Sequence, residues 1–269
     1  MVKGMNLEKL VLIRGAGDLA TGVAHRLRQA RFPVVMLEIP QPTVIRRTVS
    51  FAAAAFTGSI TVEGVTARKV TLEQVEACLT RGEIPLLIDP QGETIKMLGP
   101  KILIDAVMAK KNAVGTHCRQ APLVIALGPG FAAGKDAGAV IETQRGHDLG
   151  RVLWEGEARA NTGVPGEVAG YSGERLIRAP ADGTWEPVVE IGDLVAAGDV
   201  VARVDRAEVK SQIKGVVRGL LFPGMKVHRG MKAGDIDPRC RREHCFSISD
   251  KARAIGGGVL EAILHAGVI

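Results

Sequence analysis

The chain has 269 residues, of which 46% are hydrophobic and 24% are charged, and four are cysteines. This length and balance exclude a disordered chain and a small disulfide-stapled domain, and favour two globular units with reduced thiols. The longest apolar runs, such as residues 123–127, are far shorter than the roughly 18 residues that span a bilayer, and the N-terminus lacks a signal-peptide pattern. We therefore expect a cytoplasmic protein without a membrane segment.

The formal net charge of +6 would suit an anionic partner. Only 3% of the residues are aromatic, and the basic pairs Arg46-Arg47 and Lys110-Lys111 are short and dispersed. A nucleic-acid-binding protein usually carries a concentrated basic face or aromatic stacking residues. We therefore expect an anionic small molecule or an acidic protein as the partner, and no nucleic acid.

The first predicted element is a strand over Leu10–Ile13, followed by the turn Gly15-Ala-Gly17-Asp-Leu-Ala20 and a helix with apolar residues at helical spacing. A second apolar run, residues 34–37, ends at Glu38, which lies 21 residues after Gly17. This combination matches the GxGxxA fingerprint of a dinucleotide-binding βαβ unit, in which the acidic residue holds a ribose.

Each residue of this turn has a physical role in that interpretation. Gly15 permits the tight turn, Gly17 lets backbone amides approach a pyrophosphate, and Ala20 lets the helix pack closely on the strand. The start of the helix, with Thr21 in its first turn, offers N–H groups to an anion. Asp18 would repel an anion there, so it is instead a candidate catalytic acid. The alternative is a plain βα turn in a fold that has lost its ligand.

Helical and buried-strand patterns alternate further along the chain, with helices over 72–79 and 102–109 and strands over 84–88, 123–127 and 139–141. This alternation predicts an α/β fold with a Rossmann-like, doubly wound parallel sheet. Ligands of such sheets bind at the carboxyl ends of the strands. The loops 38–42, 89–90 and 128–131 are therefore expected around the site, which makes Gly128 and Gly130 candidate binding residues.

The C-terminal half contains an internal repeat, because residues 183–205 align without gaps on residues 215–237, with Gly183 matching Gly215. The short, glycine-punctuated strands resemble the all-β barrel-sandwich of lipoyl and biotinyl domains. Glu208 stands at the position of the modified lysine, and a carboxylate cannot form the amide, so we expect a docking element rather than a carrier. The predicted domains are a Rossmann-like cofactor-binding domain over 1–160, a β module over 161–248, and a C-terminal helix over 249–269 that packs back on the body.

Cys240 and Cys245 lie in a basic loop with His244 between them. A closed zinc site needs four ligands, and a second pair is not visible nearby, so no metal is expected. Flanking basic residues would activate a thiol, which makes Cys240, Cys245 and also Cys118, beside His117, candidate catalytic residues. The alternative is that these cysteines are reduced thiols without a chemical role.

Five motifs stand out along the chain, at 15–22, 45–51, 126–131, 140–147 and 234–239. Together they resemble the YqeB-type accessory proteins of selenium-dependent molybdenum hydroxylases, over nearly the entire chain. The N-terminal part is similar to the Rossmann unit of xanthine dehydrogenase accessory proteins. The resemblance implies a maturation factor that binds and hands over a molybdenum cofactor, so that the ligand would be a pterin.

Charged residues in two of these motifs are compatible with such a ligand. Arg46 and Arg47 would bind a terminal phosphate, and Glu142, Arg145 and His147 would flank the same cleft. The alternatives are that the two arginines only solvate a loop and that the other three residues form structural salt bridges.

We therefore expect a non-catalytic accessory protein that binds molybdenum cofactor or a dinucleotide, that is, a phosphorylated pterin or nucleotide, and that engages a molybdenum hydroxylase. One rival is an NAD(P)-dependent oxidoreductase with Glu38 on the adenosine ribose, although the single tyrosine, Tyr171, supplies no Tyr-x-x-x-Lys pair. The other rival is a sulfur or selenium carrier that uses Cys118, Cys240 or Cys245. A homo-oligomer is a further open alternative.

Overall fold

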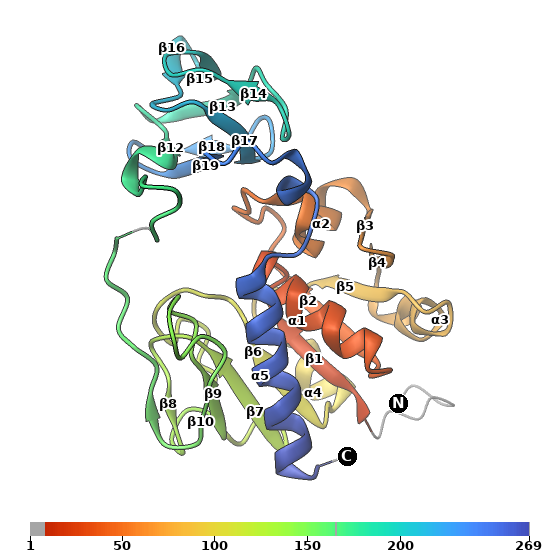
Figure 1. The fold of residues 1–269 in the computed structure, drawn as a ribbon. Coiled ribbons are helices and arrows are strands. Elements are labelled where there is room, and N and C mark those ends of the chain that lie inside the picture. The colour runs from red at the N-terminus through yellow and green to blue at the C-terminus, as the bar shows by residue number, and fades with distance from the viewer. Residues whose placement is uncertain (1–8, 165, 269) are drawn as a thin grey trace. The chain divides into compact units, whose positions relative to one another are not determined.

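The computed structural model describes residues 9–164 and 166–268, which form two compact units (Figure 1). The first unit contains the chain up to Pro42, Ser50–Asn161 and the chain from Ile248 onward. The second unit contains Thr43–Val49 and Thr162–Ser247. The short segment 43–49 therefore belongs to the second unit, although the chain on both sides of it belongs to the first.

The first unit is built on a nine-stranded sheet. The strands between its two edges pair in parallel, and the edge strands pair antiparallel with their neighbours. Runs of Val, Ile and Leu form the central strands because both faces of this part of the sheet are buried. In spatial order the strands are β10 (Val152–Leu153), β9 (Ala139–Ile141), β7 (Leu123–Leu127), β6 (Ile102–Asp105), β1 (Val11–Arg14), β2 (Val34–Glu38), β5 (Ile84–Ile88), β4 (Val65–Lys69) and β3 (Ser59–Val62). A separate two-stranded sheet joins β8 (Ala132–Ala133) to β11 (Gly156–Glu157).

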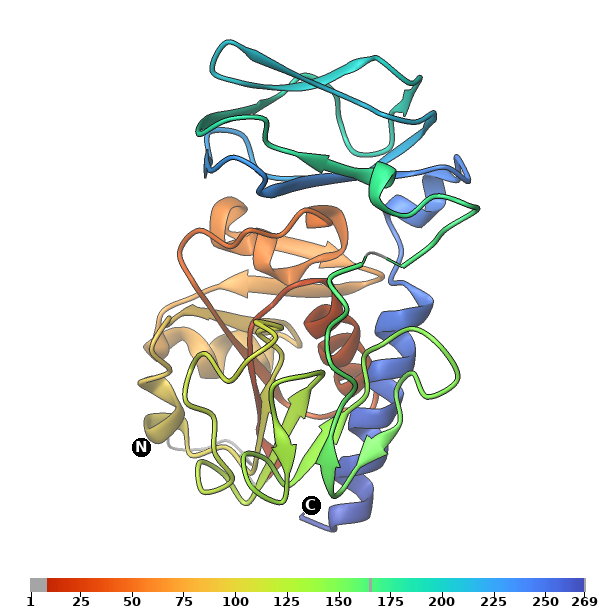
Figure 2. The ribbon, with the colours of Figure 1, turned by 90° about the vertical axis from the view of Figure 1, so that its left-hand side faces the viewer.

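Two long helices of the first unit, α1 (Asp18–Gln29) and α5 (Asp250–Ala266), lie side by side (Figure 2). Ser249 caps α5, because its hydroxyl accepts a hydrogen bond from the amide of Ala252. Helix α5 also contacts β7, β9 and β10. The end of the chain therefore covers strands from its middle. The remaining helical segments of this unit are short: η3 (Phe51–Ala53), α2 (Ala54–Thr57), η4 (Leu72–Gln74), α3 (Val75–Thr80) and α4 (Thr94–Leu98).

The predicted fold class, a Rossmann-like doubly wound sheet, is wrong for this unit. Within the described residues, the chain passes from β6 to β7 and from β7 to β9 without a helix. Residues 102–109, predicted as a helix, are strand β6 followed by a loop, because β-branched Ile102 and Ile104 favour a strand and β6 pairs with both β1 and β7. The second helical layer of a doubly wound fold is therefore incomplete: the short helices α3 and α4 pack Val75, Ile95 and Leu98 against the sheet, but no helix directly follows β6 or β7 in the described residues.

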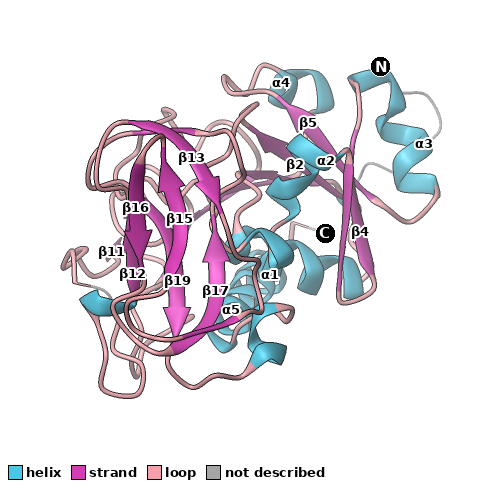
Figure 3. Cartoon of the chain, turned by 90° about the horizontal axis from the view of Figure 1, so that it is seen from above, coloured by secondary structure: helices cyan, strands magenta, loops and turns pink. Residues whose placement is uncertain are grey.

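The second unit consists of two four-stranded antiparallel sheets (Figure 3). One sheet has the order β12 (Leu176–Arg178), β19 (Lys232–Asp237), β17 (Gly215–Leu220) and β14 (Leu194–Val195). The other has the order β16 (Ala207–Lys210), β15 (Val200–Val204), β13 (Gly183–Pro187) and β18 (Lys226–Val227). The sequence repeat is visible, since β13, β14 and β15 recur as β17, β18 and β19 at the same spacing. The unit also contains the turns η2 (Arg47–Val49), η5 (Gly173–Arg175) and η6 (Arg242–Cys245).

The predicted lipoyl-like barrel-sandwich module is wrong as well. Strand β14 pairs with β17, and β18 pairs with β13, so each repeat contributes to both sheets. In the described part of this unit, however, no ladder joins one sheet to the other. The exchanged strands β14 and β18 have only two residues each, which is too short to continue from one sheet into the next. The two sheets therefore remain separate.

Two buried aspartates of β19, in the first of these sheets, are paired with arginines. Arg175 Nη2 donates to both carboxylate oxygens of Asp235, at 2.9 and 3.1 Å, and Arg239 Nη2 donates to Asp237 Oδ2 at 2.6 Å. Both aspartates are buried. Burial alone would raise the pKa of Asp237, but the hydrogen bonds from Arg239 bring it below its ordinary value.

Candidate functional site

Charged side chains gather at the carboxyl ends of the parallel strands of the first unit. Arg14 ends β1, Glu38 ends β2 and Asp105 ends β6, while Asp89 and Glu142 directly follow β5 and β9. The chain continues from β1 to β2 on one side and from β6 to β7 on the other, so the direction of winding reverses between β1 and β6. Open parallel sheets bind their ligands outside the carboxyl ends of the strands at such a reversal.

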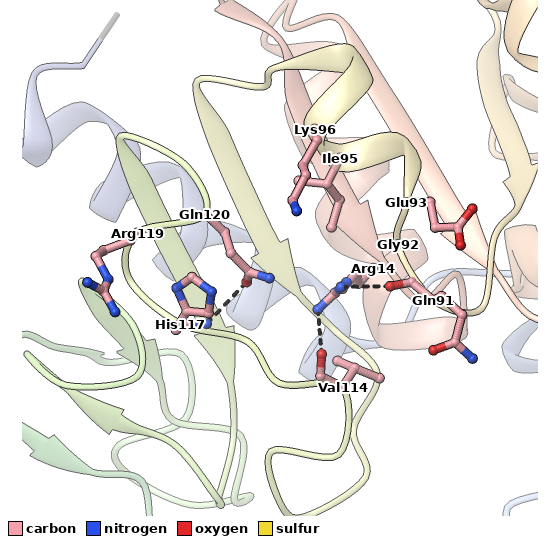
Figure 4. A pocket seen from close by; sticks show the side chains of 10 residues that line it. All are labelled: Arg14, Gln91, Gly92, Glu93, Ile95, Lys96, Val114, His117, Arg119 and Gln120. Atoms are coloured by element: carbon pink, nitrogen blue, oxygen red, sulfur yellow. Dashed lines mark hydrogen bonds between the residues drawn. The ribbon is translucent and has the colours of Figure 1, made fainter.

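A pocket of about 460 Å³ opens at this edge (Figure 4). Its lining contains three cations, Arg14, Lys96 and Arg119, and one carboxylate, Glu93. Among the residues that the structure describes, Lys96 and Arg119 form no ion pair. The excess of positive charge favours an anionic ligand. The other lining residues come from the segment after β5 and from the loop after β6: Gln91, Gly92, Ile95, Val114, His117 and Gln120.

Arg14 is the most buried charged residue of this lining, with 6% of its surface exposed. Its Nη1 donates to the carbonyl of Val114 and to Thr116 Oγ1, both at 3.1 Å, and its Nη2 donates to the carbonyl of Gln91 at 3.3 Å. An arginine has five N–H groups, so Nε–H and one Nη2–H have no acceptor within the described parts of the chain. Burial lowers the pKa of Arg14, and the nearby carboxylate of Asp105 counteracts this effect.

The segment after β5, residues 89–94, forms a turn that packs against Arg14. Asp89 accepts hydrogen bonds from the amides of Gly92 and Thr94, both at 2.8 Å, and from the Thr94 hydroxyl at 2.6 Å. Burial alone would raise the pKa of Asp89, but these hydrogen bonds lower it. Gly92 has a φ of +74°, and a Cβ there would collide with the Arg14 guanidinium. A glycine is therefore required at position 92 both by the backbone and by the arginine.

The glycine-rich turn lies next to Arg14 in the chain, and its first two amides, those of Gly15 and Ala16, donate to groups of the protein itself. The amide of Ala16 donates to Glu38 Oε2, and Glu38 Oε1 accepts from the amide of Ile39, both at 2.8 Å. Burial raises the pKa of Glu38, and these two hydrogen bonds oppose the shift. Gly15 has a φ of +86°, and a Cβ there would lie 2.9 Å from the carbonyl oxygen of Ala106. The loop after β6 therefore packs directly against this turn.

The other candidate residues of this motif lie at the start of α1. Gly17 is the N-cap and Asp18 the first helical residue, while Ala20 and Thr21 are buried. The Thr21 hydroxyl donates to a carbonyl of the turn and accepts from an amide of η3, so it serves the fold. Lys251 of α5 lies near Asp18: burial lowers the pKa of Lys251, and the charge of Asp18 opposes this. None of these residues lines the pocket.

Gly128 and Gly130 follow β7 at the same edge of the sheet, and they too lie outside the pocket lining. A Cβ at Gly128 would lie 2.5 Å from Thr143 Oγ1, and a Cβ at Gly130 would lie 2.5 Å from the Cα of Lys111. Both glycines therefore permit close packing of the loops after β6, β7 and β9.

Glu142, Arg145 and His147 are not brought together at the pocket either. Glu142 is buried, and its two oxygens accept backbone amides at 2.6 and 2.8 Å. Arg145 forms a bidentate pair with Asp250 of α5, at 2.6 and 2.9 Å, and His147 is exposed. The structural alternative, a salt bridge, therefore describes the observed contact of Arg145.

Arg46 and Arg47 belong to the second unit, on the segment 43–49, and Gly15 belongs to the first. Arg46 is buried, and its Nη2 donates to the carbonyls of His244 and Ser247, at 3.1 and 3.2 Å. The guanidinium of Arg47 lies 5.1 Å from the centroid of the Phe222 ring. Burial lowers the pKa of Arg47. Both arginines thus take part in the packing of the second unit.

The cysteines differ in exposure. Cys118 is exposed and stands between His117 and Arg119, which both line the pocket. Cys240 is half-buried, and Cys245 is buried in the second unit, where burial raises the pKa of its thiol. Burial raises the pKa of Cys78 to about 11. Across residues 9–164 and 166–268, the structure contains no group of three or more side chains that could hold a metal ion. No helix in these ranges is long and apolar enough to cross a bilayer.

Arg14, Lys96 and Arg119 are not among the site residues predicted from the sequence. A usable signal existed for Arg14, because it closes the buried run V-L-I-R just as Asp105 closes I-L-I-D. A charged residue at the carboxyl end of a buried strand lies at the edge where such sheets bind ligands. Lys96 and Arg119 carry no comparable signal, since exposed basic residues are common in loops.

Comparison with protein families found no matching family model. Among curated proteins, the chain is 54% identical over 264 residues to the uncharacterized protein YqeB of Escherichia coli, an alignment that covers 97% of this chain and 49% of YqeB. The chain thus spans about half the length of the curated relative that it matches. Among solved structures, it is similar to a succinylglutamate desuccinylase from Silicibacter (TM-score 0.26, 16% identity, 85% of this chain and 84% of that one). It is also similar to an aspartoacylase family protein from Mesorhizobium loti (TM-score 0.28, 11% identity, 84% of each chain).

These comparisons correct the resemblance drawn from the sequence motifs. No family model matches, and the curated relative is named only as uncharacterized. The recognition as an accessory protein of selenium-dependent molybdenum hydroxylases is therefore wrong as stated, because the likeness that is found is to a protein without a described function. With TM-scores this low, the site has to be interpreted from its own geometry.

Proposed function

We propose that the first unit binds a small molecule carrying a phosphate or carboxylate group in the pocket beside Arg14. The observation that carries this proposal is Arg14 itself, a buried cation that lines the pocket and retains two N–H groups without an acceptor in the described chain. A planar guanidinium matches two oxygens of a carboxylate or phosphate. Hydrogen bonds to a charged group contribute about 1.5–3 kcal/mol, so an oxyanion that accepts from the remaining N–H groups of Arg14 would be held by strong, charge-assisted bonds.

The surrounding charges support the same class of ligand. Lys96 is on α4 and Arg119 on the loop after β6, so the two cations reach the pocket from different segments around Arg14 (Figure 4). Both are exposed, and each can turn toward an anion without losing an ion pair. Glu93 is the one carboxylate of the lining and would disfavour a second negative group near its own position.

The geometry of Glu38 favours this site over the oxidoreductase alternative. In a dinucleotide-binding protein the acidic residue at the end of the second strand accepts hydrogen bonds from the ribose. Here both carboxylate oxygens of Glu38 already accept backbone amides, one of them from the turn itself. The sulfur or selenium carrier that uses Cys118, Cys240 or Cys245 stays a prediction, and it requires that replacing one of these cysteines abolishes function.

Isothermal titration of the full chain with inorganic phosphate, pyrophosphate, AMP and NAD tests the proposal. We expect at least one of these oxyanions to bind, and a Lys96→Gln/Arg119→Gln variant to bind it at least tenfold more weakly, because charge-assisted hydrogen bonds contribute about 1.5–3 kcal/mol. Lys101→Gln is the matched control for removal of a charge, since Lys101 is exposed in the same unit and lies outside the pocket lining. Equal affinities of the double variant and the wild type would refute the proposed site, as would a wild type that binds none of the probes.

A further inference from the structure

The end of strand β6 holds a carboxyl group opposite Arg14 without touching it. Arg14 and Asp105 are register partners on the neighbouring parallel strands β1 and β6. In the part of the chain that the structure describes they form no direct ion pair. Instead, the hydroxyl of Thr116 lies between them: it accepts from Arg14 Nη1 at 3.1 Å and donates to Asp105 Oδ2 at 2.5 Å.

The three side chains linked by these hydrogen bonds, Arg14, Thr116 and Asp105, are buried. Asp105 and Thr116 each expose 1% of their surface, and Arg14 exposes 6%. The other oxygen of Asp105 accepts from the amide of Val107 at 3.1 Å. Hydrogen bonds of this kind are stronger in a buried environment than in water, and losing one partner leaves the others without a substitute. The direction of the Arg14 guanidinium is therefore fixed from behind the pocket.

The same hydrogen-bonded residues also position residues 117–120, which form one wall of the pocket. The side chain of Asn112 holds the backbone of Thr116 on both sides, by accepting from its amide at 2.8 Å and donating to its carbonyl at 2.7 Å. Arg14 also binds the carbonyl of Val114. The wall residues His117, Arg119 and Gln120 follow immediately in the chain, and Gln120 closes their turn by accepting from the amide of His117 at 3.1 Å.

We infer that Thr116 and Asp105 are positioning residues of the anion site, which orient Arg14 toward the ligand and hold the 117–120 wall against it. This inference rests on the proposed function. Neither residue lines the pocket, so both act through Arg14 and the wall rather than by contact with the ligand. In this arrangement the affinity for an oxyanion depends on the hydroxyl of Thr116, although the oxyanion does not contact it.

Substitution of Thr116 tests this directly. Thr116→Val keeps the shape of the side chain but removes both hydrogen bonds of the hydroxyl, whereas Thr116→Ser keeps the hydroxyl. We expect Thr116→Val to weaken the binding of the best oxyanion probe, inorganic phosphate or pyrophosphate, at least tenfold, and Thr116→Ser to restore it to within about threefold of the wild type. Thr143→Val is the matched control, because Thr143 is also a buried threonine of the first unit and is absent from the pocket lining.

A purely structural role of Thr116 would give a different pattern. In that case Thr116→Val and Thr143→Val would lower the thermal midpoint alike and leave the affinity of the folded fraction unchanged, and the inference would fail. Hydrogen exchange adds a second readout: the amides of 112–120 should gain protection with pyrophosphate in the wild type and in Thr116→Ser, but not in Thr116→Val. If the wild type binds no oxyanion, the proposed function fails. If the wild type binds and Thr116→Val binds equally well, only the positioning role is refuted.

Discussion

Replacement of Gly22 by alanine should loosen α1 from α5 and destabilise the first unit. In the interior of a helix, alanine is intrinsically better than glycine by about 0.8–1 kcal/mol. At Gly22, however, the new Cβ would lie 2.6 Å from the Cβ of Ala252 and 2.8 Å from its carbonyl oxygen. Carbon atoms in van der Waals contact stand about 3.5–4.0 Å apart, so the helices must move apart, and overpacking of this kind typically costs about 1–3 kcal/mol.

Gly257→Ala on α5 isolates this contact, because a Cβ at Gly257 would meet no atom within 4 Å. Both variants gain the same helix propensity, so Gly22→Ala should be less stable than Gly257→Ala by about 1–3 kcal/mol, the cost of overpacking alone. Guanidinium unfolding followed by the helical circular dichroism signal measures the difference, since α1 and α5 are the longest helices described and both belong to the first unit. A midpoint for Gly22→Ala equal to or above that of Gly257→Ala would show that the close approach of the helices is not as the structure has it.

Other predictions concern charges and thiols. Hydrogen bonds from two arginines lower the pKa of Glu83 to about 2 from an ordinary 4.5, so its stabilising contribution is present above pH 4.5 and is lost as the pH falls toward 2. The free energy of unfolding of Glu83→Gln should therefore decline less steeply than that of the wild type over this range, and equal slopes would contradict the pairing. Iodoacetamide should alkylate exposed Cys118 in the native chain and spare Cys78, whose pKa is raised to about 11, as peptide mass spectrometry can show; equal labelling would contradict the burial of Cys78. Asp235→Ala should destabilise the second unit by about 3–5 kcal/mol because it leaves Arg175 buried without its carboxylate, and hydrogen exchange of β17 and β19 measures this; unchanged protection would argue against the buried pair.

Local patterns in the sequence were sufficient for much of the first unit. The apolar runs at 10–13, 34–37, 84–88, 123–127 and 139–141 are strands, and the terminal helix starts after Ser249 as its capping residue suggests. The run at 102–105 was misassigned because a short apolar segment satisfies helical and strand patterns equally, and only its pairing between β1 and β7 decides the matter. The order of the strands and the lack of helices after β6 and β7 in the described residues depend on contacts between distant segments, which periodicity does not report.

The same limit explains why the binding residues predicted from the glycine motif lie near the pocket but do not line it. The spacing from Gly17 to Glu38 is correct for a fingerprint, but spacing cannot say whether the carboxylate faces a ribose or the turn, and here it binds the amide of Ala16 that a pyrophosphate would need. The proposed anion site instead uses Arg14, one residue before the motif. Asp105 on the adjacent strand is linked to Arg14 through the hydroxyl of Thr116, which lies in the loop after β6. A buried arginine at the end of a strand requires a reason in the fold, and at this position the remaining N–H groups of Arg14 can be satisfied only by something that enters the pocket or by water.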